Sequence, residues 1–275
     1  MLNPSFLPDE ATEQLRTFCR HRLNLIDKRS STNQRIQKYL KLLNLRLDIV
    51  VNDIAGLTGM KIIRAIIAGE ADPNVLAEHR HHNCKKSKSE IAKALVSNNR
   101  ADYLFCLEKE VKLFDFLNSQ IEEIEQRIAL QINNYINCMP EVVDDLPSRK
   151  KHKRSNKNSI KTIDLNIASY QYFGGVDLLD IPGVSYSTVL SIMSELGPEG
   201  INKFPTAKQF ASWLRLALNN KISGGKILSS KVPRGSNRLK IALRNSAYSI
   251  SRLKDCPLNK FYKKMAFKKL RKYIH

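Results

Sequence analysis

The residues of this chain with the clearest chemical potential lie in one serine-, glycine- and lysine-rich stretch, residues 219–231, NNKISGGKILSSK. Ser223 precedes a Gly-Gly pair, so its hydroxyl is sterically free. Gly224 and Gly225 would let the backbone approach a phosphate closely. Ser223 could be a nucleophile, a phosphate-binding hydroxyl or merely a turn residue. As a nucleophile, a serine hydroxyl is weak and needs a base or a metal to activate it.

Basic residues surround this serine. Attack on a phosphodiester gains most from cations that stabilise the anionic transition state. The candidate phosphate-binding cations are Lys221, Lys226, Lys231, Arg234 and Arg238. Other serines nearby are runners-up as the nucleophile: Ser229, Ser230 and Ser236. A nucleotide-binding P-loop is excluded by spacing, because Asn220 and Ile227 stand where that motif needs glycine and serine or threonine.

Positive charge is concentrated at one end of the chain. The formal net charge is +20, and residues 221–275 hold 16 Lys and Arg against a single acid, Asp255. Such a segment suits a polyphosphate partner, whose binding would be driven largely by counterion release. A solvated basic tail is the alternative. An ordered nucleic-acid face is favoured by the interleaved apolar residues Leu239, Ile241, Leu243, Phe261, Met265 and Phe267.

Composition indicates a cytoplasmic protein with no membrane segment and no metal site of its own. No apolar run approaches the roughly 18 residues that span a bilayer, and MLNPSFLP does not resemble a signal peptide. The five cysteines are scattered without a CxxC pair, which favours a reducing compartment. His79 and His82 would share one helix face, but no convincing partner ligand stands elsewhere. We therefore favour a solvated helix end over a metal site there.

The elements that must position the serine are helices, and we expect a mainly α fold. Residues 1–140 form a predicted helical connector module. Its long helices run from about Asp9 to Val50 and from Lys88 to Ile136, with short helices near Met60–Ala68 and Pro73–His81. The second long stretch carries a coiled-coil seam, with Glu122, Glu123 and Glu125 off it: Phe114, Leu117, Ile121, Ile124 and Ile128. This predicts an antiparallel helical hairpin, whose seam could be bundle core or a dimerisation surface.

A basic linker, residues 141–166, separates this module from a second one, residues 167–275. Residues 178–197 predict a helix, a tight turn at Pro182-Gly183, and a second helix. This is close to a helix-hairpin-helix, whose turn binds phosphate through backbone N–H groups. Ser185 occupies the position where the helix-hairpin-helix motif usually has its second glycine, so a plain αα-corner is the alternative. Further helices are expected from Thr206 to Leu218, over residues 237–252, and from Pro257 onward.

The second module also resembles a known family. The segment that begins LLDIPGVSYSTVLSIMSELG and ends in NNKISGGKILSSK, followed by Asn237-Arg238, is similar to the C-terminal domain of the insertion-sequence "one-ten" transposases, the Piv/MooV-related DEDD enzymes. In the first module, Asp53-Ile54 with Gly56, and Ile67–Glu70 with Asp72-Pro73, resemble the coiled-coil region of that family.

The resemblance implies serine-mediated DNA cleavage and strand transfer, with Ser223 as the nucleophile. In the family, four carboxylates of a RuvC-like domain hold Mg²⁺, and a bridge RNA pairs with donor and target DNA. Those carboxylates precede the region matched here, so we expect a truncated transposase that is inactive alone, with no cofactor in this chain. Expected partners are DNA, a structured bridge-type RNA, and a second copy or an intact transposase. The alternative is a non-enzymatic DNA- or RNA-binding regulator.

Overall fold

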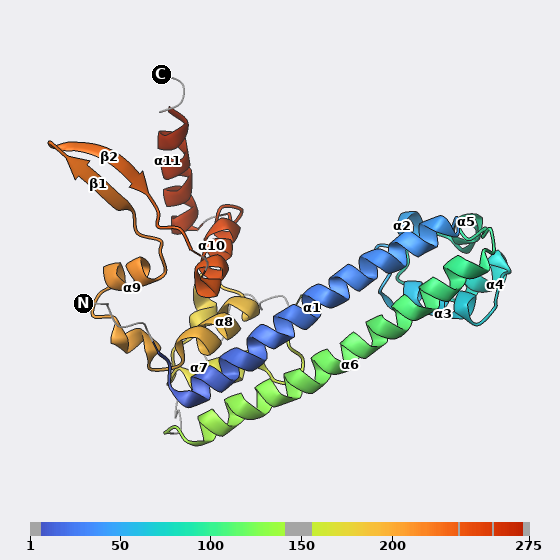
Figure 1. The fold of residues 1–275 in the computed structure, drawn as a ribbon, viewed down its shortest axis with the longest axis horizontal. Coiled ribbons are helices and arrows are strands. Elements are labelled where there is room, and N and C mark those ends of the chain that lie inside the picture. Colours follow the sequence, from blue (N-terminus) through green and yellow to red (C-terminus); the bar gives the residue numbers. More distant parts are fainter. Residues whose placement is uncertain (1–6, 141–155, 236, 255, 272–275) are drawn as a thin grey trace. The chain divides into compact units, whose positions relative to one another are not determined.

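The computed structural model describes residues 7–140, 156–235, 237–254 and 256–271, and these are mainly helical (Figure 1). The predicted mainly α fold is therefore confirmed. Two compact units divide the chain: Arg22–Glu123, and Met1–His21 together with Ile124–His275. The two longest helices contribute to both units, and the predicted domain boundaries at 140 and 166 stay a prediction. Residues 141–155 of the predicted linker lie outside the described residues.

The unit formed by residues 22–123 is built on an antiparallel helix pair. Its helices are α1 (Glu10–Leu42), α2 (Leu47–Val50), α3 (Leu57–Ile67), α4 (Pro73–Glu78), α5 (Lys88–Lys93) and α6 (Ala101–Asn137). Arg35 binds Glu110 at 2.8 Å, and Arg29 donates to Asn118 at 2.9 Å. Higher residue numbers on α1 thus meet lower numbers on α6, which confirms the predicted antiparallel hairpin.

α1 ends earlier, and α6 begins later, than the spacing of their apolar residues predicts. Asn44 and Asn99 adopt left-handed φ values of 63° and 52° at these breaks, a conformation that asparagine tolerates better than most residues. The two turns also bond to each other, because the Asn98 side chain donates to Leu42 O and the Arg46 N–H donates to Ala94 O. One continuous helix through either turn would lose these bonds.

Apolar side chains of α1, α6 and the short helices between them form the core of this unit. Ile36 and Leu40 of α1 and Leu43 just after it are almost fully buried, as are Leu107 and Val111 of α6. Capping fixes the short helices: Asp72 accepts the Asn74 N–H before α4, and Ser87 with Glu90 forms a capping box on α5.

The second unit holds the remaining elements. They are α7 (Leu165–Tyr172), the 3₁₀ turns η1 (Leu178–Asp180) and η2 (Gly200–Lys203), α8 (Tyr186–Leu196), α9 (Ala207–Trp213), β1 (Asn219–Ser223), β2 (Lys226–Lys231), α10 (Arg238–Ile250) and α11 (Pro257–Arg271). Thr206 accepts the Gln209 N–H, as predicted for an N-cap, and Asn237 caps α10 in the same way. α9 ends at Trp213, before the predicted Leu218, and Arg215 then takes a φ of 56°.

The core of this second unit joins the start of α1 and the end of α6 to α7 and α8. Leu15, Ile132, Tyr172, Val189 and Met193 are each at most 2% exposed and belong to one cluster. α8 packs in turn on α10.

The predicted seam of α6 is buried at every position except Ile124, which is half-buried.

Glu125, predicted to lie off the seam, is buried against a different segment of the chain. It is only 7% exposed, and its carboxylate accepts the Lys161 N–H at 3.3 Å while its carbonyl accepts the Thr162 hydroxyl at 3.0 Å. The glutamate therefore anchors the chain segment that leads into α7. Its two neighbours, Glu122 and Glu123, are exposed as expected.

Candidate nucleic-acid interface

The stretch that carries Ser223 is a β-hairpin and not the loop that the sequence predicts. β1 and β2 pair antiparallel, and Ser223 pairs with Lys226 directly across the turn. The turn residues Gly224 and Gly225 have φ values of 55° and 75°. A two-residue hairpin turn with positive φ at both positions matches the twist of the strands, and glycine adopts that conformation without steric cost. The glycine pair is thus explained by the turn itself.

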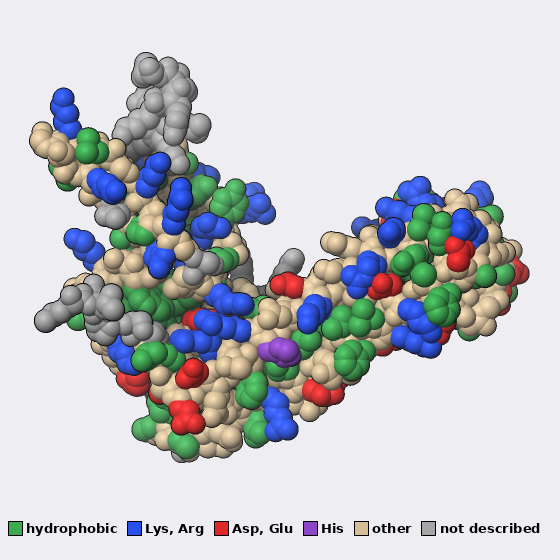
Figure 2. Space-filling model, viewed as in Figure 1, with side chains coloured by type: hydrophobic (Ala, Val, Ile, Leu, Met, Phe, Trp, Pro, Cys, Tyr) green, Lys and Arg blue, Asp and Glu red, His purple; other side chains and the backbone are tan. Residues whose placement is uncertain are grey.

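The described side chains of the hairpin are exposed, except Ser229, which is half-buried. Ile222, Ile227 and Leu228 are 62–69% exposed, and a Cβ added at Gly224 or Gly225 would meet nothing within 4 Å. Figure 2 shows Lys and Arg side chains over the hairpin and α10. The nearest acidic residue before this region in the sequence is Glu199. Residues 200–254 contain no Asp or Glu at all. A polyanion could therefore approach this surface without meeting an acidic side chain of the same segment.

Ser223 is accessible, and no group in the part of the chain that the structure describes is aligned to activate it. Among the described residues, no hydrogen bond or ion pair reaches its hydroxyl, so no base is aligned with it here. The register pairs Lys221 with Ser229 and Asn220 with Ser230. Three of the four candidate serines thus lie on one hairpin, whereas Ser236 lies outside the described residues.

The end of the hairpin leads directly into α10. Arg215, just after α9, donates from Nη1 to the carbonyl of Arg234 and so ties the segments on either side of the hairpin together. Arg234 and Arg238 are both exposed, and Arg238 is the first residue of α10. These two predicted cations therefore extend the basic surface from the hairpin to the start of the helix.

Pro182 and Gly183 occupy a tight turn that packs on α10. The Val184 N–H donates to Ile181 O at 3.1 Å, and Gly183 has a φ of 81°, as expected of a type II turn with proline second and glycine third. A Cβ on Gly183 would lie 2.5 Å from the Ser246 carbonyl oxygen. Close packing on α10 thus accounts for this glycine without a bound phosphate.

The element before this turn is a three-residue 3₁₀ turn, η1, where a helix was expected. Ser185, which replaces the second glycine of the motif, caps α8 by accepting the Thr188 N–H. The Thr188 hydroxyl in turn meets the buried Ser246 hydroxyl of α10 at 2.9 Å. These contacts link the start of α8 to α10 and set the position of the turn between them.

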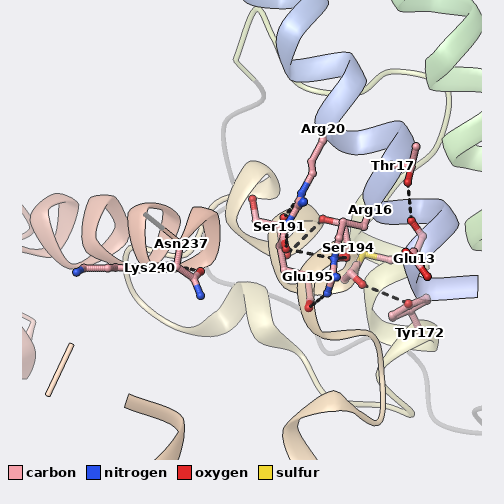
Figure 3. Close-up of polar contacts among 11 residues, drawn as sticks. Glu13, Arg16, Thr17, Arg20, Tyr172, Ser191, Ser194, Glu195, Asn237 and Lys240 are labelled. Atoms are coloured by element: carbon pink, nitrogen blue, oxygen red, sulfur yellow. Dashed lines mark hydrogen bonds and ion pairs between the residues drawn. The ribbon is translucent and has the colours of Figure 1, made fainter. Parts of the chain in front are cut away.

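Acidic residues in this unit hold the fold together. Arg20 of α1 makes two hydrogen bonds of 3.0 and 2.8 Å to the Glu195 carboxylate, and Arg16 binds the same carboxylate at 3.3 Å (Figure 3). The hydrogen bond to Glu195 raises the pKa of Arg20, while burial lowers the pKa of Arg16. Glu195 is therefore a structural anchor for α1, which sequence reasoning did not foresee because its partners lie some 175 residues away.

No group of three or more His, Cys, Asp or Glu side chains that could hold a metal ion occurs among the described residues. Asp180 ends η1 and is exposed. His79 caps the end of α4, and the rings of His81 and His82 pack on each other at 4.0 Å. The carboxylates described here therefore do not fit a magnesium site.

Residues 177–263 match the family model of the IS116/IS110/IS902 transposases. No curated protein and no solved structure matches the chain. The matched segment contains the hairpin and every candidate site residue from Pro182 to Arg238, and it supports a transposase-related function. Within the part of the chain that the structure describes, no helix is long and apolar enough to cross a membrane.

Proposed function

We propose that this chain acts in DNA transposition, with residues 167–275 binding nucleic acid and Ser223 serving as the nucleophile. The observation that carries the proposal is the family match over residues 177–263, inside which Ser223 lies exposed between Lys221 and Lys226. Duplex DNA and a structured bridge-type RNA are the proposed ligands, and a second copy or an intact transposase is the proposed protein partner.

The proposed chemical step is a transesterification. The Ser223 oxygen attacks phosphorus, an Oγ–P bond forms, and the bond from phosphorus to one flanking nucleoside oxygen breaks. The serine proton passes to a base, and the leaving oxygen takes up a proton. One phosphodiester replaces another, so no external energy source is needed. Lys221 and Lys226 would stabilise the charge that develops on the phosphoryl oxygens.

A base for this step must come from outside the described residues, because no hydrogen bond reaches the Ser223 hydroxyl within them. We therefore propose that cleavage requires a partner that carries the catalytic carboxylates. The same observation favours a second candidate function, a nucleic-acid-binding regulator that performs no cleavage. The two candidates share the binding surface and differ only in the covalent step.

The experiment combines binding with covalent capture. The full chain is titrated against labelled duplex DNA and structured RNA at several salt concentrations, and affinity should fall steeply as salt rises. The chain is then mixed with an intact transposase of the family and the DNA of its element. Protein–DNA adducts are detected afterwards by denaturing gel electrophoresis.

An adduct on this chain that appears only on mixing, and disappears in Ser223→Ala but persists in Ser230→Ala, supports the nucleophile. Salt-sensitive binding without any adduct supports the regulator instead. Affinity that stays constant between low and high salt contradicts both candidates, since each depends on phosphate contacts.

A further inference from the structure

The hairpin sorts its side chains into two chemically different faces. Directly paired residues of an antiparallel ladder lie on the same face, and successive residues alternate. The observed pairs therefore place on one face Lys221, Ser223, Lys226, Ser229 and Lys231. The other face holds Asn220, Ile222, Ile227 and Ser230. We call the first set the lysine face.

An irregularity in the ladder produces this sorting. The register shifts between Lys221 and Ile222, so that β2 contributes one extra residue, Leu228, at that point. In a regular ladder closed by the same turn, Lys221 would pair with Leu228, and Lys231 would fall on the side of Ile222. The bulge instead brings all three lysines of the hairpin to one face and leaves the Ile222–Ile227 pair on the other.

The lysine face carries cations at regular steps. Lys226 lies beside the turn, Lys221 lies two residues along the ladder, and Lys231 lies two residues further. Two residues of a strand span about 7 Å, which is about twice the 3.4 Å axial rise per phosphate of one strand of duplex DNA. Serine hydroxyls at Ser223 and Ser229 stand between these cations as further donors.

We propose that the hairpin binds the phosphodiester backbone of a nucleic-acid duplex with its lysine face alone. Lys221, Lys226 and Lys231 contact alternate phosphates of one strand, and the Ile222–Ile227 pair faces away from the duplex. This inference rests on the proposed nucleic-acid binding of the chain but not on cleavage. It also separates the candidate serines, because Ser223 and Ser229 face the phosphates and Ser230 does not.

The test moves the lysines without changing composition or charge. One variant exchanges neighbours on both strands, Asn220→Lys with Lys221→Asn and Ser230→Lys with Lys231→Ser. A matched variant, Lys221→Gln with Lys231→Gln, removes the same two cations. Parent and variants are titrated against a duplex DNA and a duplex RNA of the same sequence. Trp213 fluorescence, from the only tryptophan in the chain, verifies that each variant is folded.

Each phosphate contact contributes about 0.9 to the slope of log affinity against log salt, so both variants should lower that slope on duplex DNA by about 1.8. If the exchanged variant binds like the parent while the glutamine variant loses slope, then binding depends on the number of lysines and not on the face that carries them. That result overturns the inference. A glutamine variant with the parent's slope overturns it too. A parent that does not bind either duplex contradicts the proposed function itself. The DNA and RNA arms show which duplex is the ligand.

A measurement on the parent protein keeps the inference testable if a variant misfolds. Lysine acetylation followed by mass spectrometry compares modification with and without saturating duplex. Lys221, Lys226 and Lys231 should be protected relative to Lys61, an exposed lysine of α3. Equal modification of the three hairpin lysines in both samples overturns the inference.

Discussion

Replacement of Gly183 by alanine should strongly destabilise the unit that carries the hairpin. Gly183 has a φ of 81°, a conformation that L side chains rarely adopt. Its added Cβ would lie 2.5 Å from the Ser246 carbonyl oxygen and 2.7 Å from Ile250 Cγ1, both on α10. Contacts this short require the turn and α10 to move apart.

The expected cost has two parts. A non-glycine residue in the left-handed region costs about 1–2 kcal/mol. Overpacking that shifts neighbouring backbone costs about 1–3 kcal/mol more, so Gly183→Ala should lower the free energy of unfolding by about 2–5 kcal/mol. Gly174→Ala is the matched control, because Gly174 has a φ of 61° and a Cβ there would meet nothing within 4 Å. It should show the conformational cost alone, about 1–2 kcal/mol.

Urea unfolding followed by Trp213 fluorescence measures both variants. Trp213 packs on Phe204 and Phe210 next to the cluster that contains Leu239 of α10. Its signal therefore reports the unit in question. Equal shifts of the unfolding midpoint for Gly183→Ala and Gly174→Ala would refute the packing explanation of the turn.

The same pair of variants tests the phosphate-binding interpretation of Pro182-Gly183. If the glycine serves packing, duplex affinity measured well below the unfolding transition should change little in Gly183→Ala. A large loss of affinity with an unchanged midpoint would instead show that the turn contacts phosphate. The two explanations thus predict opposite pairs of results.

Substitutions at three further positions test contacts elsewhere. Glu195→Gln removes the carboxylate that Arg16 and Arg20 of α1 bind, and it should lower the free energy of unfolding, followed by Trp213 fluorescence, by about 1–3 kcal/mol. Asn259, only 5% exposed, donates to three carbonyls at the end of α10; Asn259→Ala should cost about 1–3 kcal/mol, and Asn259→Asp more, measured by urea unfolding. Hydrogen bonds led by the Ser87 N–H lower the pKa of Glu90 from 4.5 to about 2, so the α5 capping box is fully formed above pH 4.5 and is lost as pH falls through 2. Glu90→Gln should flatten the change in helical circular dichroism over that range.

The long helices could be predicted from sequence because their apolar stripes repeat over many turns. Their ends could not, because the stripe continues through Asn44 and Asn99 while the backbone turns. The spacing of apolar residues does not reveal that an asparagine adopts a left-handed backbone conformation. Glu125 was missed for a related reason: its burial depends on the Lys161–Thr162 segment, which comes from beyond the linker and has no fixed spacing to α6.

The hairpin was missed because its strands lack the usual signal. A half-buried strand alternates apolar and polar residues, whereas both faces of this hairpin are exposed and β2 reads as a mixture of lysine, serine and apolar residues. The Gly-Gly pair was the available signal, since paired positive φ values select glycine in two-residue turns. It was interpreted as giving a phosphate close access to the backbone, which is a different use of the same residue.

This difference changes what can be inferred about Ser223. In a loop, the serine hydroxyl could turn toward any neighbour, and geometry would not separate Ser223 from the runners-up Ser229 and Ser230. In a ladder, each serine has a fixed side, and the register places Ser223 beside Lys226 and Ser229 beside Lys221. A nucleophile must meet the phosphate on the side where the cations lie, because the same cations stabilise the transition state. If the lysine face holds the duplex as proposed, the register places Ser230 on the opposite side and argues against it as the nucleophile. Of the two hairpin serines on the lysine face, Ser223 adjoins the turn, where a Cβ added at either glycine would meet nothing within 4 Å and a nucleic-acid backbone has room to approach.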